Sequence, residues 1–138
     1  MHVKWDEKLE LGIAFMDQEH KAIIETISKL MSTLDFSQPN EEDVDSFEAF
    51  EEQVIAHFYH EELLMLQYKY PEFDSHAEAH KKILDRIDRF KKKYCRTGLN
   101  KTDLERIQSE VKFLFRMHLL EEDRELEGYV HQLLLTKK

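Results

Sequence analysis

The chain has 138 residues, of which 29 are acidic and 20 are basic, so its formal charge is −9 with histidine counted as neutral. This length suits one domain with a single core, and the acidic balance argues against nucleic-acid binding or a basic membrane-binding face. Three glycines and two prolines are too few for a many-stranded sheet, whereas 36% charged residues suit long helices. With one cysteine, Cys95, no signal-peptide core and no 18-residue apolar run, we expect a cytoplasmic protein without membrane insertion.

Residues 1–16 carry a series of apolar side chains that is broken by Gly12. The series consists of Trp5, Leu9, Leu11, Ile13 and Phe15. So much apolar surface would be costly to leave in water. We therefore expect an N-terminal arm that packs onto the domain.

Four amphipathic helices are expected after the arm, because apolar residues recur there at three- and four-residue spacing. They cover residues 18–36, 41–69, 75–94 and 102–127. The expected N-caps are Asp17, Asn40, Ser75 and Thr102, the last two in capping boxes completed by Glu78 and Glu105. Tyr70–Pro71 closes the second helix, and the tail from Gly128 to Leu135 adds a final turn or continues the fourth. Short loops between helices predict one all-α domain over 1–138, an up-and-down antiparallel four-helix bundle with an N-terminal arm.

Eight histidines are unusually many for a chain of this length, and helical spacing groups most of them. His57 and Glu61 are four residues apart, as are His76 and His80. Four residues advance an ideal helix by about 400°, so each pair projects from nearly one face. These two pairs are candidate metal ligands on the second and third helices.

The first and last helices add further candidates. His20 lies near the start of the first helix, and His118 lies on the last. Asp123 follows His118 by five residues and is displaced from it by roughly 140° on an ideal helix. Its carboxylate could reach a shared centre if the helix is distorted there or if it lies across the ligand cluster. His2, His60 and His131 are expected to lie at the surface.

Taken singly, each pair is more often a solvated or packed polar pair than a metal site. The joint pattern favours a metal, because these groups have apolar neighbours, and titratable groups facing a core are costly unless paired or metal-bound. Five imidazoles, two bridging carboxylates and a bridging oxide or hydroxide fill all but one of the positions of two octahedral ions. Such a nitrogen-rich site suits iron better than zinc or magnesium, and a diatomic molecule would bind at the open position.

The order of these motifs resembles the haemerythrin family, specifically its bacterial members. The matching residues are Trp5, Gly12–Ile13, DQEH at 17–20, HFYHEE at 57–62, Tyr70–Pro71, His76, His80, His118 and Asp123. The resemblance runs from about Trp5 to Tyr129 and fills all seven ligand positions of the family. It departs from many relatives at Leu114, where they carry Trp, and at Glu19, where Gln is common. Both departures bear on how long an oxygen complex would last.

The resemblance implies reversible O2 binding at a non-haem di-iron centre with an oxo or hydroxo bridge. It implies that His76, His80 and His118 hold the full iron, that His20 and His57 hold the iron with the vacancy, and that Glu61 and Asp123 bridge them. O2 would rest as hydroperoxide on the five-coordinate iron, in a dry pocket lined by Ile23, Phe58, Leu114, Phe115 and Leu119. The implied role is oxygen storage, transport or buffering, with no enzymatic activity beyond weak oxidase or peroxidase side reactions. No extra apolar helix face is obvious in the sequence, so we expect a monomer.

Two other functions remain open. A free-standing sensor of oxygen, nitric oxide or redox state would need a protein partner, which the sequence does not specify. A di-iron oxidase or peroxidase of the ferritin-like kind usually carries Glu-x-x-His pairs; the nearest match here is Asp17-x-x-His20. A zinc hydrolase is disfavoured, because Leu64 stands where an HExxH motif starting at His60 needs its second histidine.

Overall fold

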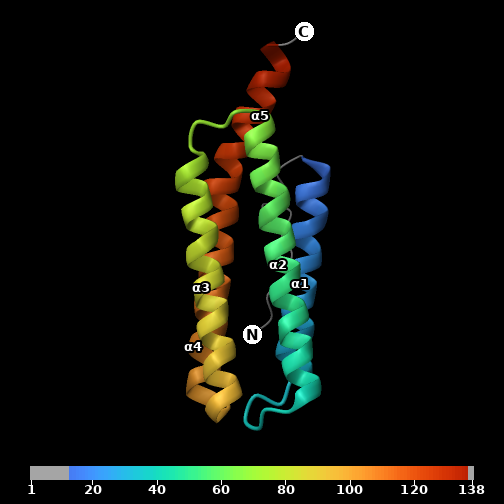
Figure 1. Cartoon of the computed structure of the whole chain (residues 1–138), viewed down its shortest axis with the longest axis vertical. Helices are drawn as coiled ribbons and strands as arrows, with labels where there is room; N and C mark the ends of the chain where they lie inside the picture. The colour runs from blue at the N-terminus through green and yellow to red at the C-terminus, as the bar shows by residue number, and fades with distance from the viewer. Residues whose placement is uncertain (1–12, 137–138) are drawn as a thin grey trace.

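The computed structural model describes residues 13–136, which form an antiparallel bundle of four long helical rods (Figure 1). They are α1 (Ala14–Thr33), α2 (Glu41–Gln67), α3 (Phe73–Thr97) and a last rod that runs through α4 (Lys101–His118), η2 (Leu119–Asp123) and α5 (Arg124–Thr136). No strand occurs among the described residues, so the predicted all-α bundle is confirmed. None of the helices from 13 to 136 is long and apolar enough to cross a membrane.

The start of the first helix differs from the prediction. Most of the predicted arm, with Trp5, Leu9, Leu11 and Gly12, lies outside the described residues, as does His2. Its predicted end at residue 16 is wrong, because α1 already begins at Ala14. The predicted cap, Asp17, lies instead in the first turn of α1, where its negative charge interacts favourably with the helix dipole.

The second and fourth helices are capped by asparagines. The Asn40 side chain accepts a hydrogen bond from the backbone N–H of Asp43 at 2.9 Å, as predicted. In α4 the same geometry belongs to Asn100, which accepts from the N–H of Asp103 at 2.8 Å. The predicted capping box of Thr102 is therefore wrong, because the helix begins one residue before it.

The turn between α2 and α3 lies two residues nearer the N-terminus than predicted. Lys69 takes a left-handed backbone conformation with φ 55°, so α2 ends at Gln67 rather than at residue 69. The α3 helix starts at Phe73, and the predicted capping box of Ser75 does not form. Phe73 packs against a small apolar cluster, and this contact draws the helix start two residues towards the N-terminus.

The two largest apolar clusters of the described residues lie on either side of a polar layer. The large cluster holds Ile23, Ile27, Leu30, Phe36, Phe47, Phe50, Val54, Phe58, Ile83, Ile87, Tyr94, Leu99, Ile107, Val111 and Phe115. The small one holds Met16, Met65, Tyr70, Leu126 and Val130, towards the end where α5 projects (Figure 1). Along the helices, the buried polar residues fall between these two sets, except that His57 on α2 precedes Phe58 of the large cluster. The fold therefore encloses a polar layer within an apolar interior.

Candidate metal centre

All seven predicted ligands belong to this buried polar layer, and none is more than 3% exposed. They are His20 on α1, His57 and Glu61 on α2, His76 and His80 on α3, His118 on α4 and Asp123 at the end of η2. Four-residue spacing explains why the two pairs on α2 and α3 each point inward together. The bundle thus brings together the residues that the sequence grouped, and their role as metal ligands stays a prediction.

The carboxylate of Glu61 lies at the middle of the layer, and its two oxygens face different imidazoles. Oε2 lies 2.9 Å from Nε2 of His20 and also contacts Nε2 of His57. Oε1 lies 2.9 Å from Nε2 of His80 and 3.1 Å from Nε2 of His76. Each oxygen therefore belongs to a separate group of nitrogen atoms.

Asp123 divides its oxygens in the same way. Its Oδ1 lies 3.0 Å from Nε2 of His76 and 3.0 Å from Nε2 of His118, whereas Oδ2 lies 3.2 Å from Nε2 of His20. Two overlapping sets of donor atoms result, each with all its atoms within 4.8 Å of one another. One holds the three imidazoles of His76, His80 and His118, the other the two of His20 and His57, and both include Glu61 and Asp123.

A π-helical segment allows Asp123 to join this cluster. The residues of η2, Leu119–Asp123, directly follow His118. A π turn pairs residues five apart, so it brings Asp123 round to the face of His118, from which an ideal α-helix would turn it by roughly 140°. The sequence left two ways for the Asp123 carboxylate to reach a shared centre, and the structure shows the distorted helix.

Several buried nitrogen and oxygen atoms of the layer point towards one another without forming a hydrogen bond. Within the described part of the chain, Nε2 of His57 and of His118 and both oxygens of Asp123 have no hydrogen-bond partner. Opposite groups nonetheless lie at ion-pair distance from each of them. Unpaired polar atoms are costly in a core, and lone pairs that face a common point suit cations between them. Five nitrogens with two shared carboxylates fit two transition-metal ions such as iron.

The same proximity determines the charges of the layer. Burial alone would lower the pKa of His57, but the charge of Glu61 and hydrogen bonds with Glu19 and Glu61 raise it to about 9. Burial would likewise raise the pKa of Glu61 and Asp123, yet the surrounding imidazoles hold both below their usual values. Without a metal, these carboxylates therefore favour protons on the imidazoles of His20, His57, His76 and His118, whereas burial lowers the pKa of His80.

Glutamates outside the layer bind the far nitrogens of two imidazoles. Nδ1 of His57 donates to Oε1 of Glu19 at 3.0 Å, and Nδ1 of His60 donates to its Oε2 at 2.7 Å. Nδ1 of His80 donates to Oε2 of Glu62 at 3.3 Å. From the sequence, Glu19 was expected only as a nearby charge, and Glu62 was not expected to have a role. Their position next to the ligands His20 and Glu61 is the signal that could have found them.

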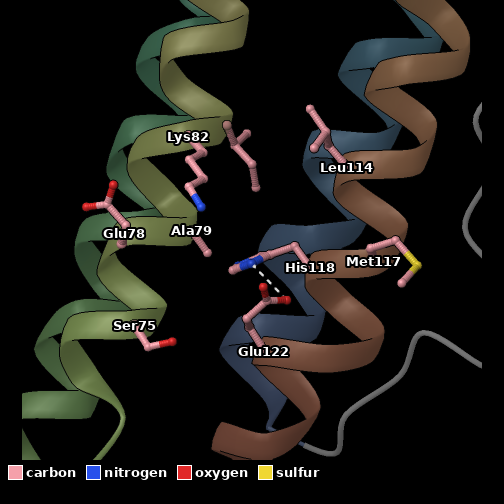
Figure 2. A pocket seen from close by; sticks show the side chains of 9 residues that line it. Ser75, Glu78, Ala79, Lys82, Leu114, Met117, His118 and Glu122 are labelled. Carbon is pink, nitrogen blue, oxygen red and sulfur yellow. Dashed lines mark ion pairs between the residues drawn. The ribbon is translucent and has the colours of Figure 1, made fainter.

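Four of the five predicted O2-pocket residues are buried, namely Ile23, Phe58, Phe115 and Leu119. The Phe58 ring stacks on His80, with 3.9 Å between ring centroids and 9° between planes. Leu114 is only partly buried and lines an open pocket of about 300 Å³ between α3 and α4 (Figure 2). His118 of α4 and Glu122 of η2 line one side of that pocket, so solvent approaches the layer there.

Comparisons with known proteins agree with this geometry. Residues 11–130 match the family model described as "Hemerythrin HHE cation binding domain". Proteins named Bacteriohemerythrin from Pseudomonas aeruginosa strains LESB58 and UCBPP-PA14 and from Pseudomonas paraeruginosa strain DSM 24068 / PA7 are each 29% identical over 96 residues. These alignments cover 67% of this chain and 60% of each relative, so the chain spans less than two thirds of the relatives that it matches.

Proposed function

The chain belongs to the haemerythrin family, and from this membership and the buried donor set we propose that it binds O2 reversibly at a two-iron centre. The observation that carries the proposal is the division of two carboxylates between a group of three imidazoles and a group of two. Such an arrangement provides two neighbouring metal positions with unequal numbers of protein ligands.

Each ligand has a role in the proposed centre. His76, His80 and His118 hold one ion, His20 and His57 hold the other, and Glu61 and Asp123 bridge the two. When bound, the ferrous ions and their oxo or hydroxo bridge would supply the electrons and the open coordination that O2 binding requires. The two-imidazole position has one protein ligand fewer, so it is the side on which the exogenous molecule is expected.

The surrounding apolar side chains would keep this side dry. Ile23, Phe58, Phe115 and Leu119 are each at most 6% exposed. Excluding water and protons favours release of intact O2 over irreversible oxidation of the metal. We therefore propose storage, transport or buffering of O2 by a monomer in the cytoplasm, where an exposed free thiol such as Cys95 stays reduced.

A di-iron oxidase or peroxidase is the second candidate, and two observations favour it. The open pocket beside His118 brings solvent near the three-imidazole group. Glu19 and Glu62 add negative charge through their hydrogen bonds to ligand imidazoles, which raises the basicity of those ligands. Both effects favour the oxidised metal.

Anaerobic reconstitution with ferrous iron tests these candidates. We expect two irons per chain and a visible absorption band that appears in air and fades under argon over repeated cycles. A band that decays to a stable oxidised spectrum, with hydrogen peroxide released or a reductant consumed, would favour the oxidase. A chain that takes up no iron would contradict both. A Glu61→Ala chain, which lacks the central carboxylate, is the matched negative control.

A further inference from the structure

The two nitrogens of the ligand imidazoles face different surroundings. In His57 and His80, Nε2 points at Glu61 inside the layer, whereas Nδ1 points outward to a second glutamate. The outer partners are Glu19 for His57, at 3.0 Å, and Glu62 for His80, at 3.3 Å. Both imidazoles therefore lie between one carboxylate inside the layer and one outside it.

An outer carboxylate decides which nitrogen carries the proton. A neutral imidazole has one N–H and one lone pair, and an ionised carboxylate can only accept a hydrogen bond. Glu19 and Glu62 thus keep the N–H at Nδ1, which leaves the lone pair of Nε2 free to face the layer. Glu19 is itself held in place by His60, a 46% exposed side chain whose Nδ1 donates to its other oxygen.

The two outer glutamates act on opposite halves of the layer. His57 belongs to the two-imidazole group and His80 to the three-imidazole group. His118 lacks comparable support, because Oε2 of Glu122 is 3.7 Å from its Nδ1 and that nitrogen has no hydrogen-bond partner among the described residues (Figure 2). Each proposed metal position therefore has one imidazole whose orientation depends on an outer glutamate.

We propose that Glu19 and Glu62 are positioning residues that hold His57 and His80 as Nδ1–H tautomers, Glu19 for the two-imidazole metal position and Glu62 for the three-imidazole position. This inference rests on the proposed two-metal centre. Loss of such an outer partner typically weakens metal binding by about 10- to 100-fold. Either metal position can thus be weakened while the other is left intact.

Titration of the metal-free chain with Co²⁺ under equilibrium dialysis tests the proposal. Glu19→Leu and Glu62→Leu remove the acceptor with little change of volume at helix positions that are about one third exposed. We expect each to retain one tight site and to weaken the other by about 10- to 100-fold. Glu19→Gln and Glu62→Gln keep an acceptor and should recover most of the loss. Glu52→Gln removes a charge on the exposed surface of α2, away from the polar layer, and should bind as the parent chain does.

Proton NMR of the Co²⁺-loaded chains provides a second readout. Exchangeable imidazole N–H protons of the ligands shift strongly beside Co²⁺, and we expect Glu19→Leu and Glu62→Leu to speed the solvent exchange of two different signals. Leucine variants that bind both ions as tightly as the parent, or glutamine variants as weak as the leucine ones, would overturn the positioning roles. A parent chain that fails to bind two Co²⁺ ions would instead overturn the two-metal centre itself. Far-UV circular dichroism confirms that each variant is folded.

Discussion

At the scale of single residues, Glu61 connects the two halves of the site. Its side chain is fully buried, and a carboxylate in such a place is costly unless opposite charge or hydrogen-bond donors surround it. Four imidazole nitrogens lie within 3.1 Å of its oxygens, two at each oxygen, and these contacts offset the cost of burying the charge. This arrangement makes Glu61 the residue on which both proposed metal positions depend.

Replacing His118 tests the ligand assignment. We expect His118→Ala to leave the bundle folded, because the large apolar cluster lies elsewhere, and to lose at least one iron per chain. Iron analysis after anaerobic reconstitution measures the loss. The control is His131→Ala, which removes an exposed imidazole paired with Glu127 at 3.1 Å and should keep two irons. Two irons retained by His118→Ala would show that this residue is not a ligand.

At the scale of helices, the N-cap of α4 is Asn100 in the structure, whereas the sequence predicted Thr102. Asn100 accepts the N–H of Asp103 in the structure, whereas Thr102 lies inside the helix. We expect Asn100→Ala to lower the free energy of unfolding by about 1 kcal/mol, because a backbone N–H loses its partner. Thr102→Ala should leave it unchanged or raise it slightly, since Ala is the better helix former. Urea denaturation measures the free energy of unfolding of both variants. A larger decrease for Thr102→Ala than for Asn100→Ala would support the capping box of Thr102 instead.

The end of α3 depends on the freedom of one glycine. Gly98 has φ 68°, and a Cβ there would lie 2.4 Å from the backbone oxygen of Ser37. We expect Gly98→Ala to cost at least about 1–3 kcal/mol, because both the conformation and the contact oppose a side chain. Gly128→Ala, where a Cβ meets nothing within 4 Å, should stabilise the helix by about 0.5–1 kcal/mol. Chemical denaturation measures both, and similar effects at the two positions would be inconsistent with this geometry.

At the scale of the whole molecule, a polar layer interrupts an otherwise apolar interior. The protons on its imidazoles, which balance the charges of Glu61 and Asp123, make the stability of the metal-free protein depend on pH. Opposing the effect of burial, the neighbouring carboxylates raise the pKa of His57 to about 9 and also raise those of His20, His76 and His118. Protonation therefore stabilises the folded metal-free chain.

The direction of this dependence is testable. The contribution of these histidines is complete below their ordinary pKa of about 6.5 and is lost as the pH rises towards 9. We expect the melting temperature of the metal-free protein to fall across that interval. Metal ions replace these protons, so the loaded protein should not show the decline, and its metal affinity should rise with pH. Thermal denaturation with chelator and with anaerobic ferrous iron measures both, and a metal-free melting temperature that rises from pH 6.5 to 9 would contradict the charge assignment.

The sequence by itself determined the helical class and the composition of the polar layer. Apolar periodicity is a local property, as is the four-residue spacing of His57 with Glu61 and of His76 with His80, so both can be read without contacts. Asn40 was also predictable as a cap, because it competes only with its immediate neighbours. That these residues bind metal stays a prediction.

The features that depend on contacts between helices could be known only from the tertiary structure. No local sequence pattern predicted three features that depend on packing. They are the π segment that turns Asp123 inward, the start of α1 at Ala14 and the open pocket beside Leu114. Glu19 and Glu62 became outer partners of the layer because α1, α2 and α3 approach each other there. Local spacing specifies which side chains share a face, whereas the meeting of those faces determines which nitrogen and which oxygen lie together.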